Sequence, residues 1–348
     1  MKTVIALFVV FSACSKAPQT EVKTGEQQVS EAVEAVEAVE AVEAVEAVKE
    51  APAPSTAEKE KKVADRSADF RAKADIEKKR WAEEGLEKSA KKLLKKPFPN
   101  TGRGLSLILA SPHRSNENRA RDKFRHPKKT LLFFGIKPSH TVVEVGAGGG
   151  WYTEVLALLL ANKGTLFAVS MDPNGPSDNM MTAYGRRFQW FLEKSPTAFG
   201  KVRPVYISPP ERLELGPAGS ADVAIAVREM HNWHRRGLLQ DYLKSVHAVL
   251  RTGGTFGVVQ HRAKPGSDPD ESAGLGYLPE KWLVEQVEAA GFKRVASSEV
   301  NANPKDTKDY KEGVWTLPPS LTLGDTDREK YSAIGESDRM TVKFKKVK

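Results

Sequence analysis

Short apolar runs alternate with longer amphipathic segments between residues 141 and 260 of the chain. A run of four to eight apolar and β-branched residues is typical of a buried strand, and apolar residues three or four positions apart are typical of a covering helix. This pattern predicts strands at 141–145, 165–169, 202–207, 221–227 and 255–259, and helices at 151–164, 177–194 and 238–250. Strands that alternate with helices in this way form a mostly parallel sheet with helices on both faces.

The pattern is different in the first hundred residues. Residues 31–48 are six copies of Glu-Ala-Val, and a three-residue repeat turns by about 300° per copy on a helix, so no apolar stripe forms. The sequence "APAPSTA" at 51–57 ends any helix there, and residues 58–96 are dense in Lys and Glu. We therefore expect residues 14–100 to form a tether, with a solvated helix or a disordered spacer at its end, and residues 101–348 to form the folded domain. Partner binding through the repeats is the alternative.

The first thirteen residues contain one positive charge at Lys2, an apolar stretch, and the small residues Ser12 and Ala13 directly before Cys14. They resemble a bacterial lipoprotein signal peptide, although Phe11 stands where such signals prefer Leu. The resemblance implies that residues 1–13 are removed and that Cys14 is lipidated. The apolar stretch is too short to span a bilayer. The expectation is a bacterial, membrane-anchored lipoprotein that faces the periplasm; the alternative is an uncleaved apolar N-terminus.

Composition narrows the classes of partner. The 348-residue chain has a formal net charge of +9 and a pI near 9.3, with 40% hydrophobic and 28% charged residues. The positive charges are scattered, which suits attraction to phospholipid head groups or to nucleic acid, but the aromatic and basic signature of a nucleic-acid-binding fold is missing. No nucleic-acid partner is expected. Cys14 is the only cysteine, which excludes an internal disulfide and a thiolate metal cluster.

The first predicted strand of the domain leads into a glycine-rich turn, "VVEVGAGGGWYTE" at 142–154. Glycines let backbone N–H groups approach a carboxylate or a phosphate, and the following helix points its positive end at the same place. A dinucleotide fingerprint would need glycine at Trp151. The spacing instead resembles motif I of class I S-adenosylmethionine-dependent methyltransferases, and the residues that match it are Glu144, Gly146, Ala147, Gly148 and Gly150. The carboxylate of Glu144 suits the ammonium and sulfonium of S-adenosylmethionine better than it suits the pyrophosphate of a dinucleotide. The alternative is that the glycines only permit a tight turn.

The resemblance extends over residues 106–348. The segments at 108–138, 228–233 ("REMHNW") and 334–340 ("IGESDRM") together resemble a family of predicted bacterial methyltransferases, many of which carry export signals. The resemblance implies S-adenosylmethionine as the cofactor and a Rossmann-like, seven-stranded, mostly parallel α/β sheet. Its last strand, at 339–347, would be antiparallel, and residues 279–300 would supply the preceding helix and strand.

Two positions depart from this class, and both concern the cofactor. The second strand usually ends in an acid that binds the ribose hydroxyls, whereas this chain has Ser170, with Asp172 as a substitute two residues later. The loop after the third strand usually offers an acid to the adenine, whereas Pro209 stands there and Glu211 is nearby.

In this class the segment after the fourth strand faces the methyl group. His231 is the candidate general base, because its ordinary pKa lies near neutrality. Glu229 and Asn232 are candidates to orient the acceptor, Arg228 is a candidate substrate residue, and Trp233 is a candidate apolar wall. The alternative is that Trp233 packs in the core and His231 bonds a backbone carbonyl. A zinc site at His231 and His234 would need further ligands, so no metal is expected.

Two more segments have a structural and a functional interpretation. Residues 111–127 are expected to form a helix with Arg121 and Arg125 on one face. The segment predicts a solvated cationic face, or else a lid over the cofactor or a clamp for an anionic substrate. Residues 301–338 form a long stretch that predicts either a lid or surface packing of Trp315.

Two functions follow as alternatives. The first is a membrane-tethered methyltransferase that acts on a small or lipid-like acceptor. The second is an exported binding or accessory protein that keeps the fold without turnover. The Asn or Asp, Pro-Pro and aromatic pattern of N-methyltransferases is missing, which argues against an amide or nucleobase nitrogen as acceptor.

Overall fold

The computed structural model describes residues 55–347. The expected signal peptide, Cys14 and the Glu-Ala-Val repeats lie outside this range. Residues 56–347 belong to one compact unit. Its strands are β1 (Thr141–Val145), β2 (Thr165–Met171), β3 (Arg203–Ile207), β4 (Ala221–Val227), β5 (Leu250–His261), β6 (Phe292–Ser298) and β7 (Arg339–Lys346).

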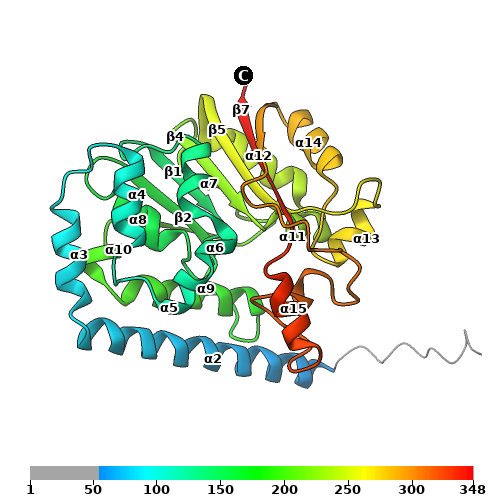
Figure 1. Cartoon of the computed structure of the whole chain (residues 1–348), viewed down its shortest axis with the longest axis horizontal. Helices are drawn as coiled ribbons and strands as arrows, with labels where there is room; N and C mark the ends of the chain where they lie inside the picture. Colours follow the sequence, from blue (N-terminus) through cyan, green and yellow to red (C-terminus); the bar gives the residue numbers. More distant parts are fainter. Residues whose placement is uncertain (1–54, 348) are drawn as a thin grey trace, which may run out of the picture. The chain divides into compact units, whose positions relative to one another are not determined.

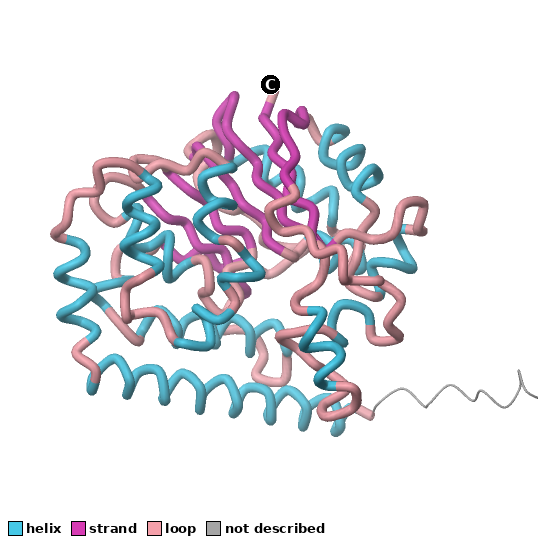
Figure 2. Tube along the Cα trace, viewed as in Figure 1, coloured by secondary structure: helices cyan, strands magenta, loops and turns pink. Residues whose placement is uncertain are grey.

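The seven strands form a single sheet in the order β3-β2-β1-β4-β5-β7-β6 (Figures 1 and 2). The pairs among β1 to β5 are parallel, and β7 is antiparallel to both β5 and β6. This confirms the predicted Rossmann-like sheet with an antiparallel last strand. The strand order reverses between β1 and β4, and in open α/β sheets ligands bind outside the carboxyl ends of the strands at this point.

Helices cover both faces of the sheet. They are α2 (Thr56–Glu83), α3 (Leu86–Leu94), α4 (Thr101–Leu109), α5 (Asn116–Ala120), α6 (Asp122–Arg125), α7 (Pro127–Phe133), α8 (Thr153–Leu160), α9 (Met180–Glu193), α10 (Pro196–Phe199), α11 (Met230–Arg235), α12 (Leu239–Val249), α13 (Pro269–Gly274), α14 (Glu280–Ala289), the 3₁₀ helix η1 (Gly313–Thr316) and α15 (Arg328–Ile334).

Successive residues of a strand point to opposite faces, and the core divides accordingly. On β1, Val142 packs in a cluster with the side chains of α3, α4, α8 and α9, whereas Val143 and Val145 pack in a second cluster with α11, α12 and α14. Both faces of the central strands are therefore buried, which explains their nearly continuous apolar sequence.

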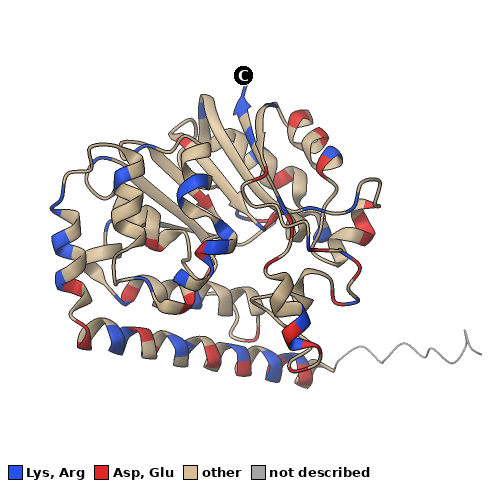
Figure 3. Cartoon of the chain, viewed as in Figure 1, with Lys and Arg blue, Asp and Glu red and all other residues tan. Residues whose placement is uncertain are grey.

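The expected boundary of the tether, near residue 100, is too late. Residues 56–94 form α2 and α3, which belong to the folded unit, and α2 packs along α9 (Figure 1). Acidic and basic residues alternate along α2 (Figure 3), but Val63, Phe70 and Trp81 of this helix are buried. Trp81 is only 1% exposed and lies against Phe199. Because most residues of α2 are charged, its narrow apolar face was not recognised in the sequence.

The single helix predicted at 111–127 is also wrong, because the segment contains two short helices. The Ser115 side chain accepts a hydrogen bond from the Asn118 backbone N–H at 3.2 Å and starts α5 there. Residue His126, with φ of 40°, separates α6 from α7. The arginines of the segment do not form a solvated face, since Arg114 is fully buried and Arg125 is 4% exposed.

Within residues 55–347, no helix is both long enough and apolar enough to cross a lipid bilayer.

Candidate active site

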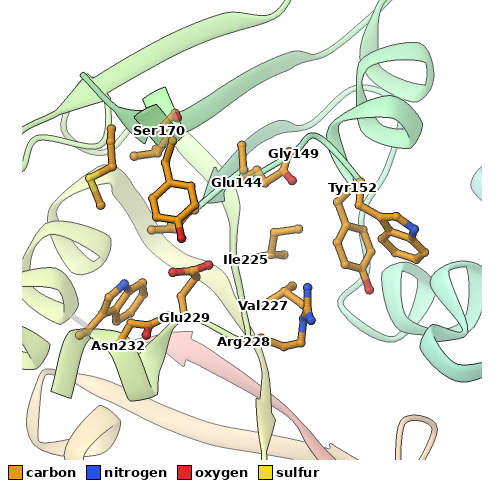
Figure 4. Close-up of a pocket in the computed structure, with 18 of the residues that line it drawn as sticks. Glu144, Gly149, Tyr152, Ser170, Ile225, Val227, Arg228, Glu229 and Asn232 are labelled. Atoms are coloured by element: carbon orange, nitrogen blue, oxygen red, sulfur yellow. The ribbon is translucent and has the colours of Figure 1, made fainter. Parts of the chain in front are cut away.

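A cavity of about 620 Å³ opens at the carboxyl ends of β1 and β4, where the strand order reverses (Figure 4). A volume of several hundred Å³ is usual for a small-molecule site. The glycine turn after β1, the end of β2, the segment after β4, and side chains of α6 and α9 all contribute to its wall. The lining residues used below are Asn118, Arg121, Arg125, Glu144, Gly146, Gly148, Gly149, Tyr152, Ser170, Met171, Met181, Tyr184, Arg187, Arg228, Glu229, His231, Asn232, Trp233, His261 and Trp315.

Glu144 supplies a carboxylate at the end of β1. It is 5% exposed, and its Oε2 accepts a hydrogen bond from the Thr153 hydroxyl at 2.7 Å, which fixes the carboxyl group. Burial raises the pKa of Glu144 to about 8, and the Thr153 hydrogen bonds only partly oppose this. A cation in the cavity would stabilise the ionised form of this carboxylate. The site therefore favours a positively charged ligand beside β1.

The glycines of the turn have different roles. Gly146 has φ of 81°, and a Cβ there would lie 2.6 Å from Cγ of Glu229. A Cβ on Gly150 would lie 2.4 Å from the ring of Phe191. These two glycines are needed for packing within the protein. Gly148 has φ of 57°, and within residues 55–347 the nearest atom beyond its chain neighbours would lie 3.9 Å from such a Cβ, so it faces open space in the cavity. Ala147 is buried and continues the strand, because its N–H donates to the Val169 carbonyl.

The acids expected near the ribose and adenine lie beside the main cavity. Asp172 forms an ion pair with Arg212, and its Oδ1 accepts a hydrogen bond from the backbone N–H of Asn174. Asp172 and Glu211 line an adjoining hollow of about 370 Å³, and Met171 lines both hollows. Ser170, at the end of β2, lines the main cavity itself.

The segment after β4 contributes two ionisable groups. Arg228 has φ of 62°, a left-handed conformation that is strained for a side chain of this size. Burial lowers the pKa of Arg228 well below its ordinary value. Burial also raises the pKa of Glu229 to about 7, although Arg228 opposes this. Asn232 hydrogen-bonds the Glu229 carboxyl group. Figure 4 shows Glu229 and Asn232 on one side of the cavity and Arg228 with Tyr152 on the other.

His231 also reaches the cavity, but its surroundings do not suit a base. It is 3% exposed, and burial lowers its pKa to about 4. Nε2 of Gln260 lies 3.2 Å from Nδ1 of His231 and 3.2 Å from the Gly276 carbonyl oxygen. An amide nitrogen has two N–H donors, so it can donate to both, and Nδ1 then acts as an acceptor. The proton of the neutral ring is on Nε2, which makes His231 a hydrogen-bond donor.

Trp233 lines the cavity as well, and it packs as the structural alternative predicted. It is 3% exposed and stacks on Tyr242, with ring centroids 4.4 Å apart and an angle of 2° between the rings. This stack holds the tryptophan as a rigid part of the wall.

Arg121 and Arg125 come together with residues from the other end of the chain. Both donate to the Glu336 carboxylate, Arg125 at 2.8 Å and Arg121 at 3.4 Å. Burial would raise the pKa of Glu336, but the attraction of Arg125, Arg339 and Arg228 outweighs it and lowers the pKa to about 2. Arg121 and Arg125 thus meet at one carboxylate, but they do so from two short helices and not from one face of a single helix.

Three lining residues on α9 were not predicted from the sequence. Tyr184, Met181 and Arg187 lie on α9, which was recognised only as a helix. A Cβ on Gly149 would lie 2.4 Å from Nη2 of Arg187, so this guanidinium rests on the glycine turn. Trp315 also reaches the cavity and does not pack only at the surface. The aromatic residue in a long polar stretch was the available signal.

No group of three or more His, Cys, Asp or Glu side chains in the described part of the chain is arranged to hold a metal ion.

No protein-family model and no curated protein match this chain. Solved structures similar to it include a SAM dependent methyltransferase from Aquifex aeolicus, with 18% identity, a TM-score of 0.42, and 70% of this chain and 98% of that chain covered. A geranyl diphosphate C-methyltransferase from Streptomyces coelicolor A3(2) has 14% identity and a TM-score of 0.43, with 69% and 87% covered. A 1,6-didemethyltoxoflavin-N1-methyltransferase from Burkholderia thailandensis has 19% identity and a TM-score of 0.37, with 65% and 78% covered.

Proposed function

We propose that this chain binds S-adenosylmethionine and transfers its methyl group to a small or lipid-like acceptor. The observation that carries the proposal is the buried Glu144 carboxylate at the end of β1, followed by a glycine turn whose Gly148 faces open space in the cavity. A ligand with an ammonium and a sulfonium satisfies a carboxylate that has no ion-pair partner among residues 55–347, and the turn leaves room for it.

The residues fit this cofactor in three places. Glu144 would accept the ammonium, and Arg187 of α9, whose guanidinium rests against the glycine turn, would bind the methionine carboxylate. The ribose and adenine would extend past Ser170 and Met171 toward Met181. The cofactor supplies an activated methyl group, so the protein has mainly to align the acceptor and take up its proton.

Glu229 fits the role of proton acceptor better than His231 does. A base works best when its pKa lies near the working pH, and the pKa of Glu229 is about 7. Asn232 holds the Glu229 carboxyl group. Neutral His231 would donate from Nε2 to an acceptor oxygen, and Trp233 and Trp315 would exclude water from the reacting atoms.

Calorimetric titration of the full chain with S-adenosylhomocysteine and, separately, with NAD⁺ tests the cofactor. We expect saturable binding of S-adenosylhomocysteine and none of NAD⁺. Binding of NAD⁺ alone, or of neither ligand, would contradict the proposal.

A second candidate is a binding or accessory protein that keeps the fold without turnover. It is favoured by one observation: Asp172, the substitute for the ribose acid, is already paired with Arg212 and lines the adjoining hollow. A lost charge-assisted hydrogen bond would weaken cofactor binding by about tenfold or more. Micromolar or tighter binding of S-adenosylhomocysteine would favour the enzyme, whereas millimolar binding would favour the accessory role.

We further propose that Cys14 is lipidated and tethers the domain to a bacterial membrane on its periplasmic side. Support for this proposal comes from the apolar run before Cys14 and from the small residues Ser12 and Ala13. Cys14→Ser should release the protein from the membrane fraction or leave the precursor uncleaved. Unchanged size and unchanged fractionation would exclude the tether.

A further inference from the structure

The cavity wall opposite the carboxylates contains an excess of buried arginine. Four guanidinium groups, those of Arg121, Arg125, Arg228 and Arg339, interact with one carboxylate, Glu336. Arg125 and Arg339 are within 2.8 Å of the Glu336 oxygens, and all three side chains are less than 5% exposed. Glu336 therefore neutralises one of the four charges.

Other acids do not restore the balance. Glu117 raises the pKa of Arg121, but its effect is smaller than those of Arg125 and Glu336. Glu229 lies near Arg228, but its pKa of about 7 means that it is only partly ionised at neutral pH. Buried charges are usually paired, so an uncompensated group of arginines is costly unless a ligand completes it.

The hydrogen bonds of this group are incomplete in the same way. In residues 55–347, the buried Nε of Arg228, Nη2 of Arg125 and Nε of Arg339 find no hydrogen-bond partner. Arg228 and Arg125 line the cavity, as does Arg121. Arg228 is also held in a left-handed backbone conformation, and such strain is common where a side chain must reach a ligand. Neighbouring N–H donors on guanidinium forks match the oxygens of phosphate or carboxylate.

We propose that the methyl acceptor carries an anionic oxygen group, a phosphate or a carboxylate, and that Arg228, Arg121 and Arg125 bind it. This inference rests on the proposed function for the identity of the acceptor, although anion binding itself does not depend on it. The acceptor would place its anionic end between Arg228 and Tyr152 and its reacting atom near Glu229. Figure 4 shows Arg228 and Tyr152 on one side of the cavity and Glu229 on the other.

The carboxylate of the cofactor is the competing occupant of this arginine group. Arg187 argues against it, because its guanidinium already rests on Gly149 of the glycine turn, where the methionine end of the cofactor would lie. The cavity thus offers one cation for the cofactor and a separate group for the acceptor.

The test is a calorimetric titration of the full chain, saturated with S-adenosylhomocysteine, with pyrophosphate, inorganic phosphate and acetate in turn. We expect at least one of the three to bind with one-to-one stoichiometry. Stronger binding of pyrophosphate or phosphate would identify a phosphorylated acceptor, and stronger binding of acetate a carboxylic acid. Arg228→Met, which keeps the length of the side chain and removes its charge, should weaken anion binding by at least tenfold and change S-adenosylhomocysteine affinity by less than about twofold.

Arg294→Met is the matched control, since Arg294 is an exposed arginine on β6 and lies outside the cavity. It removes the same net charge and should leave anion binding unchanged. If Arg228→Met fails to fold, Arg121→Met tests the same group, because Arg121 is 21% exposed and is bound only at 3.4 Å to Glu336.

Three results would overturn the inference: no anion binds the saturated protein, the anions displace S-adenosylhomocysteine, or Arg228→Met and Arg121→Met both bind anions as the wild type does. If S-adenosylhomocysteine does not bind at all, the proposed function fails by itself. The same anion titrations on the unliganded chain then decide whether the arginine group is an anion site.

Discussion

The raised pKa of Glu144 predicts that cofactor affinity depends steeply on pH. In the unliganded protein this buried carboxyl group has a pKa of about 8, so most of it is protonated at pH 7. An ammonium bound beside it would favour the ionised form and release the proton. At pH 7 binding should then release about 0.9 proton per ligand.

The size of the effect follows from the fraction of Glu144 that is ionised before binding. That fraction rises from about one hundredth at pH 6 to about one half at pH 8, so the affinity for S-adenosylhomocysteine should rise by about fifty-fold over this range. Above pH 8 it should level off. Titrations in buffers with different ionisation enthalpies measure the released proton directly.

The stability of the unliganded protein should change in the opposite direction. The folded-state pKa of Glu144 lies above its ordinary value of 4.5, so the folded state binds the proton more tightly than the unfolded state. This contribution is present at low pH and is lost as the pH rises through 8. The free energy of unfolding should fall by about 2 kcal/mol from pH 6 to pH 8 from this group alone.

Glu144→Gln separates this carboxyl group from others. It should weaken binding at pH 8 by about tenfold to a hundredfold and remove the dependence on pH. Glu229→Gln is the control, because its pKa of about 7 gives it a titration of its own in the same cavity, and this variant should keep the slope due to Glu144. An affinity of the wild type that is flat between pH 6 and 8, with no proton released, would refute the reasoning.

Three further predictions concern the turn, the reaction and the fold. Gly148→Val should abolish S-adenosylhomocysteine binding and lower the free energy of unfolding by only about 1–2 kcal/mol, measured by calorimetry and urea denaturation; intact binding would place the ligand elsewhere. With an acceptor in hand, Glu229→Gln should slow single turnover by about 10²- to 10⁴-fold, whereas His231→Ala should mainly raise the KM for the acceptor; the reverse result would restore His231 as the base. Trp81→Ala should lower the free energy of unfolding by about 3–5 kcal/mol, and no change would mean that α2 and α3 are a tether after all.

The parts of the site that lie close together in the sequence could be predicted from it. Glu144 and the glycine turn follow one another within seven residues, and the strand before them is apolar enough to be recognised. The glycine turn was therefore enough to predict a ligand site at the end of β1. The segment from Arg228 to Trp233 followed in the same way from the apolar run of β4.

The arginine group could not be predicted, because its members are far apart in the sequence. Arg125 and Glu336 are separated by 211 residues and meet only when β7 is in place. Nor does any local pattern show that Arg228 adopts a left-handed conformation. Helix α2 did carry a signal: Val63, Phe70 and Trp81 are spaced seven and eleven residues apart, which places them on one face of a helix.

The position of β7 has a consequence for how the protein is made. Among the strands of residues 55–347 it comes last in chain order, yet it is paired on both sides, with β5 and β6. Glu336 and Arg339, at its start, complete the arginine group on the cavity wall. A chain still emerging from the ribosome can form β1 to β5, but it has neither a finished sheet nor a complete cavity. Removal of residues 336–346 would therefore take away Glu336 and Arg339 together with an interior strand. Arg121 and Arg125 would remain, but they would lose the carboxylate to which they donate.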